Sequence, residues 1–504
     1  MLRKRMIVGL SLLLTGPVHA EDPAGSAGSP SVPQELVGLR ERWESAMKDL
    51  DVPGLAVVVV RGGKVIYTET LGERDPEKHL PVTPDTIFYI ASCTKSFMAM
   101  AVMSLVEEGK IELDAPVKKY FPKFQVADSA VTETLTVRDL LSHAKGLDSG
   151  PIVSLDAFTG EITEERFYRW LREAKATGAF NYTNLHYTLL GRIVEVVSGK
   201  SWKDYLDDRI LKPAGMTRTT AYAGRMYGDA DAAIPCDLEK GNLVAARVRK
   251  TDRTMHAAGG MGASIHDLGR WLRLNMGKGT IDGRRILSES SMLEIQRTQA
   301  RATAPATRGS RTRDGYGFGW STGTYGGKNM LEHGGGYVGA GALVAFLPDE
   351  GIGVAAVANT NRPITEIAIF DVCDRLLGLS RADELPRLKQ FAAERRQRQS
   401  NRERLFEKRP VTSEGLSISI DRYAASYDNP DWGTYVIENR DGRLFAHWGD
   451  LSLRLRSTDK DTFEADSGSG DPDKCRFEVK GDRVEAVVII VDEEQKLEAR
   501  FTRK

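Results

Sequence analysis

A serine followed three residues later by a lysine is the first arrangement in this chain that could carry out chemistry. On a helix, residues three apart share a face, so the lysine amine can lie beside the serine hydroxyl. A serine hydroxyl needs such a nearby base to become a nucleophile. Four pairs have this spacing, so the pattern alone is weak evidence. The pairs are Ser45/Lys48, Ser92/Lys95, Ser142/Lys145 and Ser457/Lys460.

The surroundings of Ser92 distinguish its pair from the other three. Ser92 follows a strand-like segment, residues 87–91, and precedes a run, residues 97–106, that is apolar on nearly every face. A helix that is apolar all round is buried. We therefore expect Ser92 at the N-terminus of a buried helix, where free N–H groups and the helix dipole favour a developing anion. A simple N-cap serine is the alternative interpretation.

Tyr182 and Asn184 form the second candidate element, just ahead of a helical pattern at residues 187–197. A tyrosine acts as a general base only if its pKa falls from about 10, which a cation such as Lys95 can cause. The amide of Asn184 can hold both the lysine and a substrate carbonyl. Taken alone, this tyrosine is more typical of a half-buried structural residue.

The third element is His333-Gly334-Gly335, just before a predicted hairpin. Glycines let the backbone of a strand come close to a ligand. The N–H groups of Gly336 and Ser92 would together make a two-donor oxyanion hole. The glycines here also match the spacing of a dinucleotide-binding loop, but paired strands rather than a helix follow, which excludes that interpretation.

These residues, in this order, resemble the three motifs of serine β-lactamases and penicillin-binding proteins. The resemblance is closest to the class C β-lactamase-like group, which includes D-aminopeptidases and esterases, and it extends over about residues 35–380. It implies an acyl-enzyme on Ser92, with Lys95 and Tyr182 sharing proton transfer. It also implies that Asn184, His333, Gly335 and Gly336 contact the substrate or its oxyanion. The flanking Leu140–His143, Leu189–Gly191 and Gly259–Met261 resemble the same group.

His333 is where this chain departs from many β-lactamases and D,D-peptidases, which carry a lysine there. Lysine offers a permanent cation to a substrate carboxylate, whereas histidine is mostly neutral at pH 7. We therefore expect esterase or D-aminopeptidase-like activity rather than efficient β-lactam hydrolysis. A true β-lactamase or D,D-carboxypeptidase is one alternative. A non-catalytic sensor of penicillin or peptidoglycan fragments is another, of a different class.

The elements that must position these residues point to an α+β fold. Residues 55–61 and 64–70 flank Gly62-Gly63 and predict a hairpin. Helical patterns dominate from residue 92 to 300, and strands return at 343–347 and 352–358. Strands at both ends with helices between them predict one antiparallel sheet flanked by helices, with a helical insertion beside it.

The remaining segments predict further parts of the chain. Residues 1–20 have a basic start, a short apolar run and a small-residue cleavage site, as in a signal peptide, which predicts a periplasmic or secreted protein. Residues 21–34 are typical of a flexible leader. The hydrolase domain is expected at 35–380, a charged linker helix at 381–412 and a small lipocalin-like barrel or sandwich at 413–504.

Composition narrows the class of partner. Lys and Arg together number 70, as do Asp and Glu, so no strong field favours nucleic acid. We expect a small-molecule or peptide substrate, cell-wall derived in one version, and no membrane span once the signal is removed. No cofactor or metal motif is present. The four cysteines are expected as buried thiols, with a Cys236–Cys373 bridge as the alternative.

Overall fold

The computed structural model describes residues 32–239, 242–380, 383–408, 415–466, 473–492 and 497–504. The predicted signal peptide and nearly all of the predicted leader lie outside these residues. Among the described helices, none is both long and apolar enough to cross a membrane.

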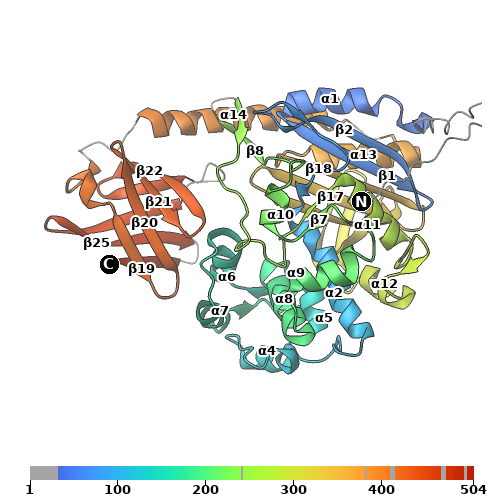
Figure 1. Cartoon of the computed structure of the whole chain (residues 1–504), viewed down its shortest axis with the longest axis horizontal. Helices are drawn as coiled ribbons and strands as arrows, with labels where there is room; N and C mark the ends of the chain where they lie inside the picture. Colours follow the sequence, from blue (N-terminus) through green and yellow to red (C-terminus); the bar gives the residue numbers. More distant parts are fainter. Residues whose placement is uncertain (1–31, 240–241, 381–382, 409–414, 467–472, 493–496) are drawn as a thin grey trace, which may run out of the picture.

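A nine-stranded antiparallel sheet forms the centre of the larger part of the molecule (Figure 1). Its strand order is β13-β14-β15-β16-β17-β18-β1-β2-β3. The first strands of the chain thus pair with its later ones, because β1 lies between β18 and β2. The predicted antiparallel sheet is confirmed. The strands are β1 (Gly54–Arg61), β2 (Lys64–Asp75), β3 (Leu80–Pro81), β13 (Ala300–Arg308), β14 (Arg311–Tyr316), β15 (Ser321–Tyr325), β16 (Lys328–Tyr337), β17 (Ala340–Leu347) and β18 (Ile352–Ala358).

Both faces of this sheet are buried, which explains why β1 is apolar at seven successive positions rather than alternating. Leu55, Val57 and Val59 share one core with α1 (Leu39–Leu50) and α13 (Ile364–Leu377). Ala56, Val58 and Val60 face the opposite core, which α2 (Thr94–Glu107) and α11 (Ile265–Met276) cover. The sheet is therefore the middle layer between two helical layers.

The predicted helical insertion occupies most of residues 94–296. Short two-stranded and three-stranded sheets interrupt it. Its other helices are α3 (Val117–Tyr120), α4 (Ser129–Thr134), α5 (Val137–Ser142), α6 (Gly150–Ser154), α7 (Glu164–Leu171), α8 (Asn184–Ser198), α9 (Trp202–Leu206), α10 (Ala223–Tyr227) and α12 (Glu289–Gln296). Its short strands are β4 (Phe88–Tyr89), β5 (Leu147–Asp148), β6 (Lys175–Ala176), β7 (Thr219–Thr220), β8 (Cys236–Glu239), β9 (Asn242–Ala245), β10 (Gly262–Ala263), β11 (Thr280–Ile281) and β12 (Arg284–Arg285).

The C-terminal part is a closed eight-stranded barrel, so the structure selects the barrel over the sandwich. Helix α14 (Leu385–Lys408) runs along the larger part toward it (Figure 1). Ion pairs from Lys389 to Asp49 and from Arg396 to Asp51 fix this helix to the end of α1. Likeness to lipocalins stays a prediction. The barrel strands are β19 (Ala425–Asn429), β20 (Gly433–Arg440), β21 (Arg443–Trp448), β22 (Leu451–Asp459), β23 (Thr462–Asp466), β24 (Asp473–Lys480), β25 (Arg483–Asp492) and β26 (Leu497–Arg503).

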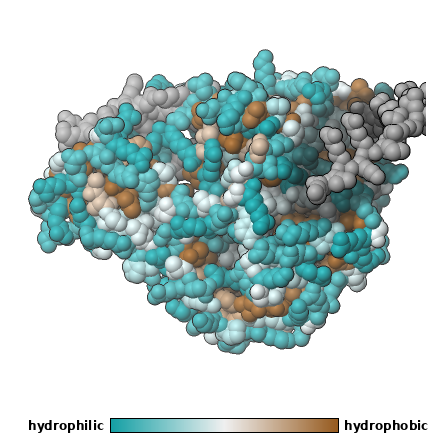
Figure 2. All heavy atoms as spheres, viewed as in Figure 1, coloured by the Kyte–Doolittle hydropathy of each residue, from teal (hydrophilic) through white to brown (hydrophobic). Residues whose placement is uncertain are grey.

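Polar residues cover most of the face shown in Figure 2, and apolar residues appear there in small groups.

The cysteines were expected as buried thiols, with a Cys236–Cys373 bridge as the alternative. Cys93, Cys236 and Cys475 are buried free thiols, so the alternative Cys236–Cys373 bridge is not formed.

Candidate active site

Ser92 lies in a 3₁₀ turn, Ala91–Cys93, directly ahead of the buried helix α2. Ser92 thus lies at the N-terminal end of this helix, as expected; the helix begins at Thr94, with Cys93 in the N-cap position. Ser92 is therefore not the capping residue. Ala91 has a φ of 45°, a left-handed conformation that is unfavourable for a residue with a Cβ. Such backbone conformations concentrate at functional sites.

Lys95 extends from the first turn of α2 into the centre of the site and is 0% exposed. Its Nζ lies 3.3 Å from Ser92 Oγ, 2.8 Å from Asn184 Oδ1 and 2.7 Å from the carbonyl oxygen of Ala258. The Asn184 and Ala258 oxygens can only accept hydrogen bonds. A neutral amine has two N–H donors and one lone pair. Two donors satisfy these two acceptors, which leaves the lone pair for the Ser92 hydroxyl.

The surroundings of Lys95 favour that neutral form. Burial lowers the pKa of Lys95 well below its usual value, because a charged ammonium loses its hydration there. Its Nζ lies over the ring faces of Tyr182, 4.7 Å from the centroid, and Tyr187, 5.6 Å away. These rings supply only partial compensation for a charge. Lys95 therefore loses its proton more readily than an ordinary lysine and is placed to accept one from Ser92.

Tyr182 precedes α8 and lies beside the same serine. Its hydrogen bond with Ser92 favours ionisation, but removal of water from its hydroxyl has the larger effect and raises its pKa. The residue keeps 41% of its surface exposed, while its ring packs against His143 at 4.7 Å between centroids. Desolvation of the phenol thus outweighs the contacts that lower the pKa of Tyr182, which disfavours the tyrosine as the base. The tyrosine stays protonated.

His333 lies on β16 and is almost wholly buried, with 4% exposure. Its Nδ1 is 2.8 Å from the Gly334 carbonyl oxygen, and its Nε2 is 2.9 Å from Tyr316 Oη. A carbonyl can only accept, so Nδ1 carries the proton and Nε2 accepts from the tyrosine. Burial lowers the pKa of His333 to about 3. The imidazole is therefore neutral and offers no cation to a substrate.

Strand β16 brings its glycines against the turn that carries Ser92. A Cβ added to Gly335 would lie 2.1 Å from the Ile90 carbonyl oxygen and 3.0 Å from Ser92 N. Only glycine permits this approach. A Cβ on Gly336 would instead face Asn361, 3.2 Å away. The pairing of β15 with β16 ends at Glu332, so the part of β16 from His333 onward extends past β15.

Six of the seven residues singled out from the sequence thus converge on one site, and the seventh, Gly336, follows Gly335 on β16. Two contributors were missed: the Ala258 carbonyl and Tyr316, which fixes the tautomer of His333. Tyr316 lies in a segment where Gly315, Gly317 and Gly319 alternate with buried aromatic residues. That alternation was a usable signal, since a Cβ on Gly319 would lie 2.6 Å from the Lys95 carbonyl oxygen. A backbone carbonyl such as that of Ala258 has no signature in sequence.

Comparison with known proteins places this site in a family. The family model described as Beta-lactamase matches residues 39–369, more than half of the chain. The chain belongs to the β-lactamase family of serine hydrolases, which is the family that its motifs resemble.

The individual relatives have low sequence identity to this chain. Protein flp from Staphylococcus aureus (strain MW2) is 27% identical over 316 residues, which are 62% of this chain and 60% of that protein. The chain thus matches less than two thirds of the length of flp. Penicillin-binding protein 4 from Amycolatopsis lactamdurans is 28% identical over 357 residues, 67% of this chain and 88% of that protein.

A solved structure extends the likeness to nearly the whole chain. The octameric penicillin-binding protein homologue from Pyrococcus abyssi has a TM-score of 0.59 and 25% identity, and the match covers 92% of this chain and 99% of that one. The coverage includes the C-terminal part as well as the matched family region. The α+β fold of the β-lactamase and transpeptidase type is therefore confirmed.

Proposed function

We propose that the protein cleaves an ester or an amide bond of a small molecule or peptide through an acyl-enzyme on Ser92. The observation that carries this proposal is the set of three contacts of Lys95 Nζ, with Ser92, Asn184 and the Ala258 carbonyl. Together they orient a desolvated amine toward a serine hydroxyl. That is the arrangement that an activated nucleophile requires.

In this mechanism Lys95 takes the proton of Ser92 as Oγ attacks the substrate carbonyl carbon. The resulting oxyanion would accept hydrogen bonds from the N–H groups of Ser92 and Gly336. Collapse breaks the bond to the leaving group, which receives the proton by way of Lys95 and Tyr182. Water then attacks the acyl-enzyme, and the acid leaves with Ser92 restored. Because its raised pKa keeps Tyr182 protonated, we assign the phenol to relaying the proton from Lys95 rather than to the role of the base.

Esterase or D-aminopeptidase-like activity is proposed ahead of β-lactamase or D,D-carboxypeptidase activity. The neutral, buried His333 supports this order, since a carboxylate-bearing substrate would find no cation at that position. The relative named penicillin-binding protein 4 favours the second candidate, β-lactamase or D,D-carboxypeptidase activity.

We also propose a periplasmic or secreted location from residues 1–20, which N-terminal sequencing of the exported protein would test.

Turnover of three substrate classes tests the proposal. Short-chain aryl esters and D-aminoacyl amides should be hydrolysed more efficiently than a chromogenic β-lactam, and Ser92→Ala should abolish all turnover. Faster hydrolysis of the β-lactam would reverse the proposed order. Full activity of Ser92→Ala would reject the mechanism, and no turnover of any class would reject it in favour of the sensor.

A further inference from the structure

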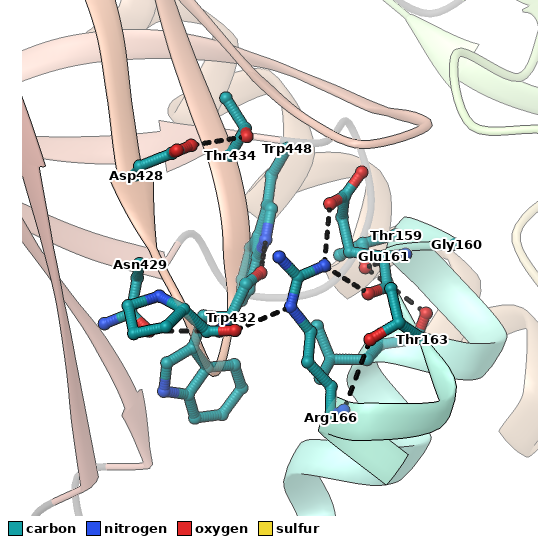
Figure 3. Close-up of polar contacts among 12 residues, drawn as sticks. Thr159, Gly160, Glu161, Thr163, Arg166, Asp428, Asn429, Trp432, Thr434 and Trp448 are labelled. Atoms are coloured by element: carbon teal, nitrogen blue, oxygen red, sulfur yellow. Dashed lines mark hydrogen bonds and ion pairs between the residues drawn. The ribbon is translucent and has the colours of Figure 1, made fainter. Parts of the chain in front are cut away.

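The barrel is held against the active-site part by a specific set of contacts (Figure 3). The Nε of Arg166 on α7 donates to the Pro430 carbonyl oxygen at 2.8 Å, and Trp170 Nε1 donates to the Asp431 carbonyl oxygen at 2.9 Å. Asp450 N donates to the Thr159 carbonyl oxygen at 2.8 Å. One loop of the barrel therefore contacts α7, and another contacts the segment between α6 and α7.

Two barrel glycines make this approach close. A Cβ on Gly449 would lie 2.1 Å from the Thr159 carbonyl oxygen, and one on Gly433 would lie 2.4 Å from Glu161 Oε2. Both have positive φ values, 55° and 95°. The barrel and the active-site part are thus fitted to one another at backbone distance.

Directly beside this junction lies a cavity of about 260 Å³ with walls from both parts. It is larger than a cavity of roughly 150 Å³, which suffices for benzene. Apolar side chains make up most of its walls, and Ser154, Thr159 and the carboxyl of Asp473 add polar groups. From the active-site part come Phe158, Tyr337 and Val338, and from the barrel come Trp448, Leu453 and Ile490.

The register of β16 connects this cavity to Ser92. Alternate residues of a strand face the same side, so His333, Gly335 and Tyr337 share the face on which Gly335 meets Ser92 N. Tyr337 also packs on Tyr89 of β4, at 5.7 Å between ring centroids, just ahead of the turn that carries Ser92. Two residues along a strand span roughly 7 Å. Tyr337, in the cavity wall, therefore lies about that far along β16 from Gly335, on the side of the sheet where Gly335 meets Ser92 N.

The cavity wall is also held in place. The Lys250 amine contacts the Ala157 carbonyl oxygen and lies over the rings of Tyr337, at 4.1 Å, and Phe158, at 5.3 Å. One buried side chain thus ties together two residues that line the cavity. A cavity with fixed walls is suited to selecting among ligands, because little ordering is required on binding.

We propose that this cavity binds an apolar substituent of the substrate while its scissile carbonyl lies at Ser92, so that the barrel takes part in substrate selection. This inference rests on the proposed function. It adds the substrate class, which is esters or amides that carry an apolar group longer than an acetyl or methyl group. The group belongs to the acyl side or to the leaving side.

Two ester series distinguish these sides. One varies the acyl chain from acetate to decanoate with a constant phenol, and the other varies the alcohol of an acetate ester. In one series, kcat/KM should rise about fourfold for each methylene that enters the cavity, equivalent to ~0.8 kcal/mol, and then level off. Ile490→Trp, which fills the cavity, should remove the rise but keep acetate turnover. Ile420→Trp, a half-buried isoleucine of the same part that does not line the cavity, is the matched control.

A second pair of variants tests the barrel itself. Gly449→Ala should flatten the same series by pushing the barrel from Thr159. Gly442→Ala carries a similar positive φ of 76° with open space around it and should leave the series intact. Calorimetric titration with octanoate gives a readout without turnover: octanoate should bind more tightly than acetate, and Ile490→Trp should remove the difference.

The outcomes separate the two proposals. Acetate turnover that requires Ser92, with no chain-length dependence in either series, overturns the cavity inference and leaves the proposed function standing. A preference for chains that end in an ammonium group also overturns it, since Asp473 would then select a cation. No turnover of any ester, together with equal binding of octanoate and acetate, overturns both.

Discussion

Replacing Lys95 by arginine separates a base from a cation at the centre of the site. Arginine stays protonated in proteins, so it can donate to Asn184 and Ala258 but cannot take a proton from Ser92. Loss of a general base lowers rates by roughly 10²–10⁴, or ~3–5 kcal/mol in the barrier. We expect kcat/KM for an aryl ester to fall by that factor in Lys95→Arg.

The pair Ser142/Lys145, which has the same spacing as Ser92/Lys95, supplies the matched control. Lys145 is 44% exposed on its side chain and pairs with Asp139 at 3.1 Å, so Lys145→Arg should leave kcat/KM unchanged. Circular dichroism checks that each variant is folded. Retention of more than about a tenth of wild-type kcat/KM in Lys95→Arg would refute the assignment of the base.

The wild-type pH profile tests the same assignment without a substitution. Since the pKa of Lys95 is lowered, the amine should stay neutral to a lower pH than an ordinary lysine and become protonated below that lowered value. The rising limb of kcat/KM should therefore lie well below the ordinary lysine pKa of about 10.4. A limb near that ordinary value would contradict the account.

Three further predictions concern the neighbours of this pair. Gly335→Ala should lower kcat/KM at least tenfold, because its Cβ would meet the Ile90 carbonyl, whereas Gly334→Ala, with no atom nearer than 3.7 Å, should not; equal loss would contradict the close approach. Tyr182→Phe should lower kcat but leave the rising limb in place; a shifted limb would make the tyrosine the base. The folded pKa of His333 is about 3, so below about pH 6.5 the unfolded chain binds a proton at this residue that the folded chain does not. The free energy of unfolding should therefore fall by up to ~1.4 kcal/mol per pH unit as the pH drops below about 6.5. Urea denaturation at several pH values should show, for His333→Gln, a dependence of that free energy on pH that is smaller by one proton.

Much of the fold could be predicted from the sequence, because its signals are local. The glycine pair at 62–63 marks a hairpin that the structure contains, and the strands predicted at 343–347 and 352–358 pair with one another. The apolar helix after Ser92 and the alternating C-terminal strands were also predictable from the sequence. Closure of those strands into a barrel was not, since it depends on pairing between β19 and β26, which are far apart in sequence.

The residues of the site could also be predicted only in part. Residue types and their order indicated Ser92, Lys95 and His333, but not the protonation of the lysine and tyrosine. Those states depend on burial, which sets Lys95 and Tyr182 in opposite directions from their usual pKa values. The cavity beside the barrel was also out of reach, because its walls come from separate segments spread between Ser154 and Val491.

Covalent labelling of Ser92 tests the central claim most directly. The full chain is treated with an alkyl fluorophosphonate, which reacts with activated serines, and the product is examined by intact mass and peptide mapping. We predict one adduct per chain, on Ser92, that is absent from Ser92→Ala and retained in Ser142→Ala and Ser457→Ala. An adduct on another serine, or an unlabelled wild-type chain, would contradict the assignment of Ser92 as the nucleophile.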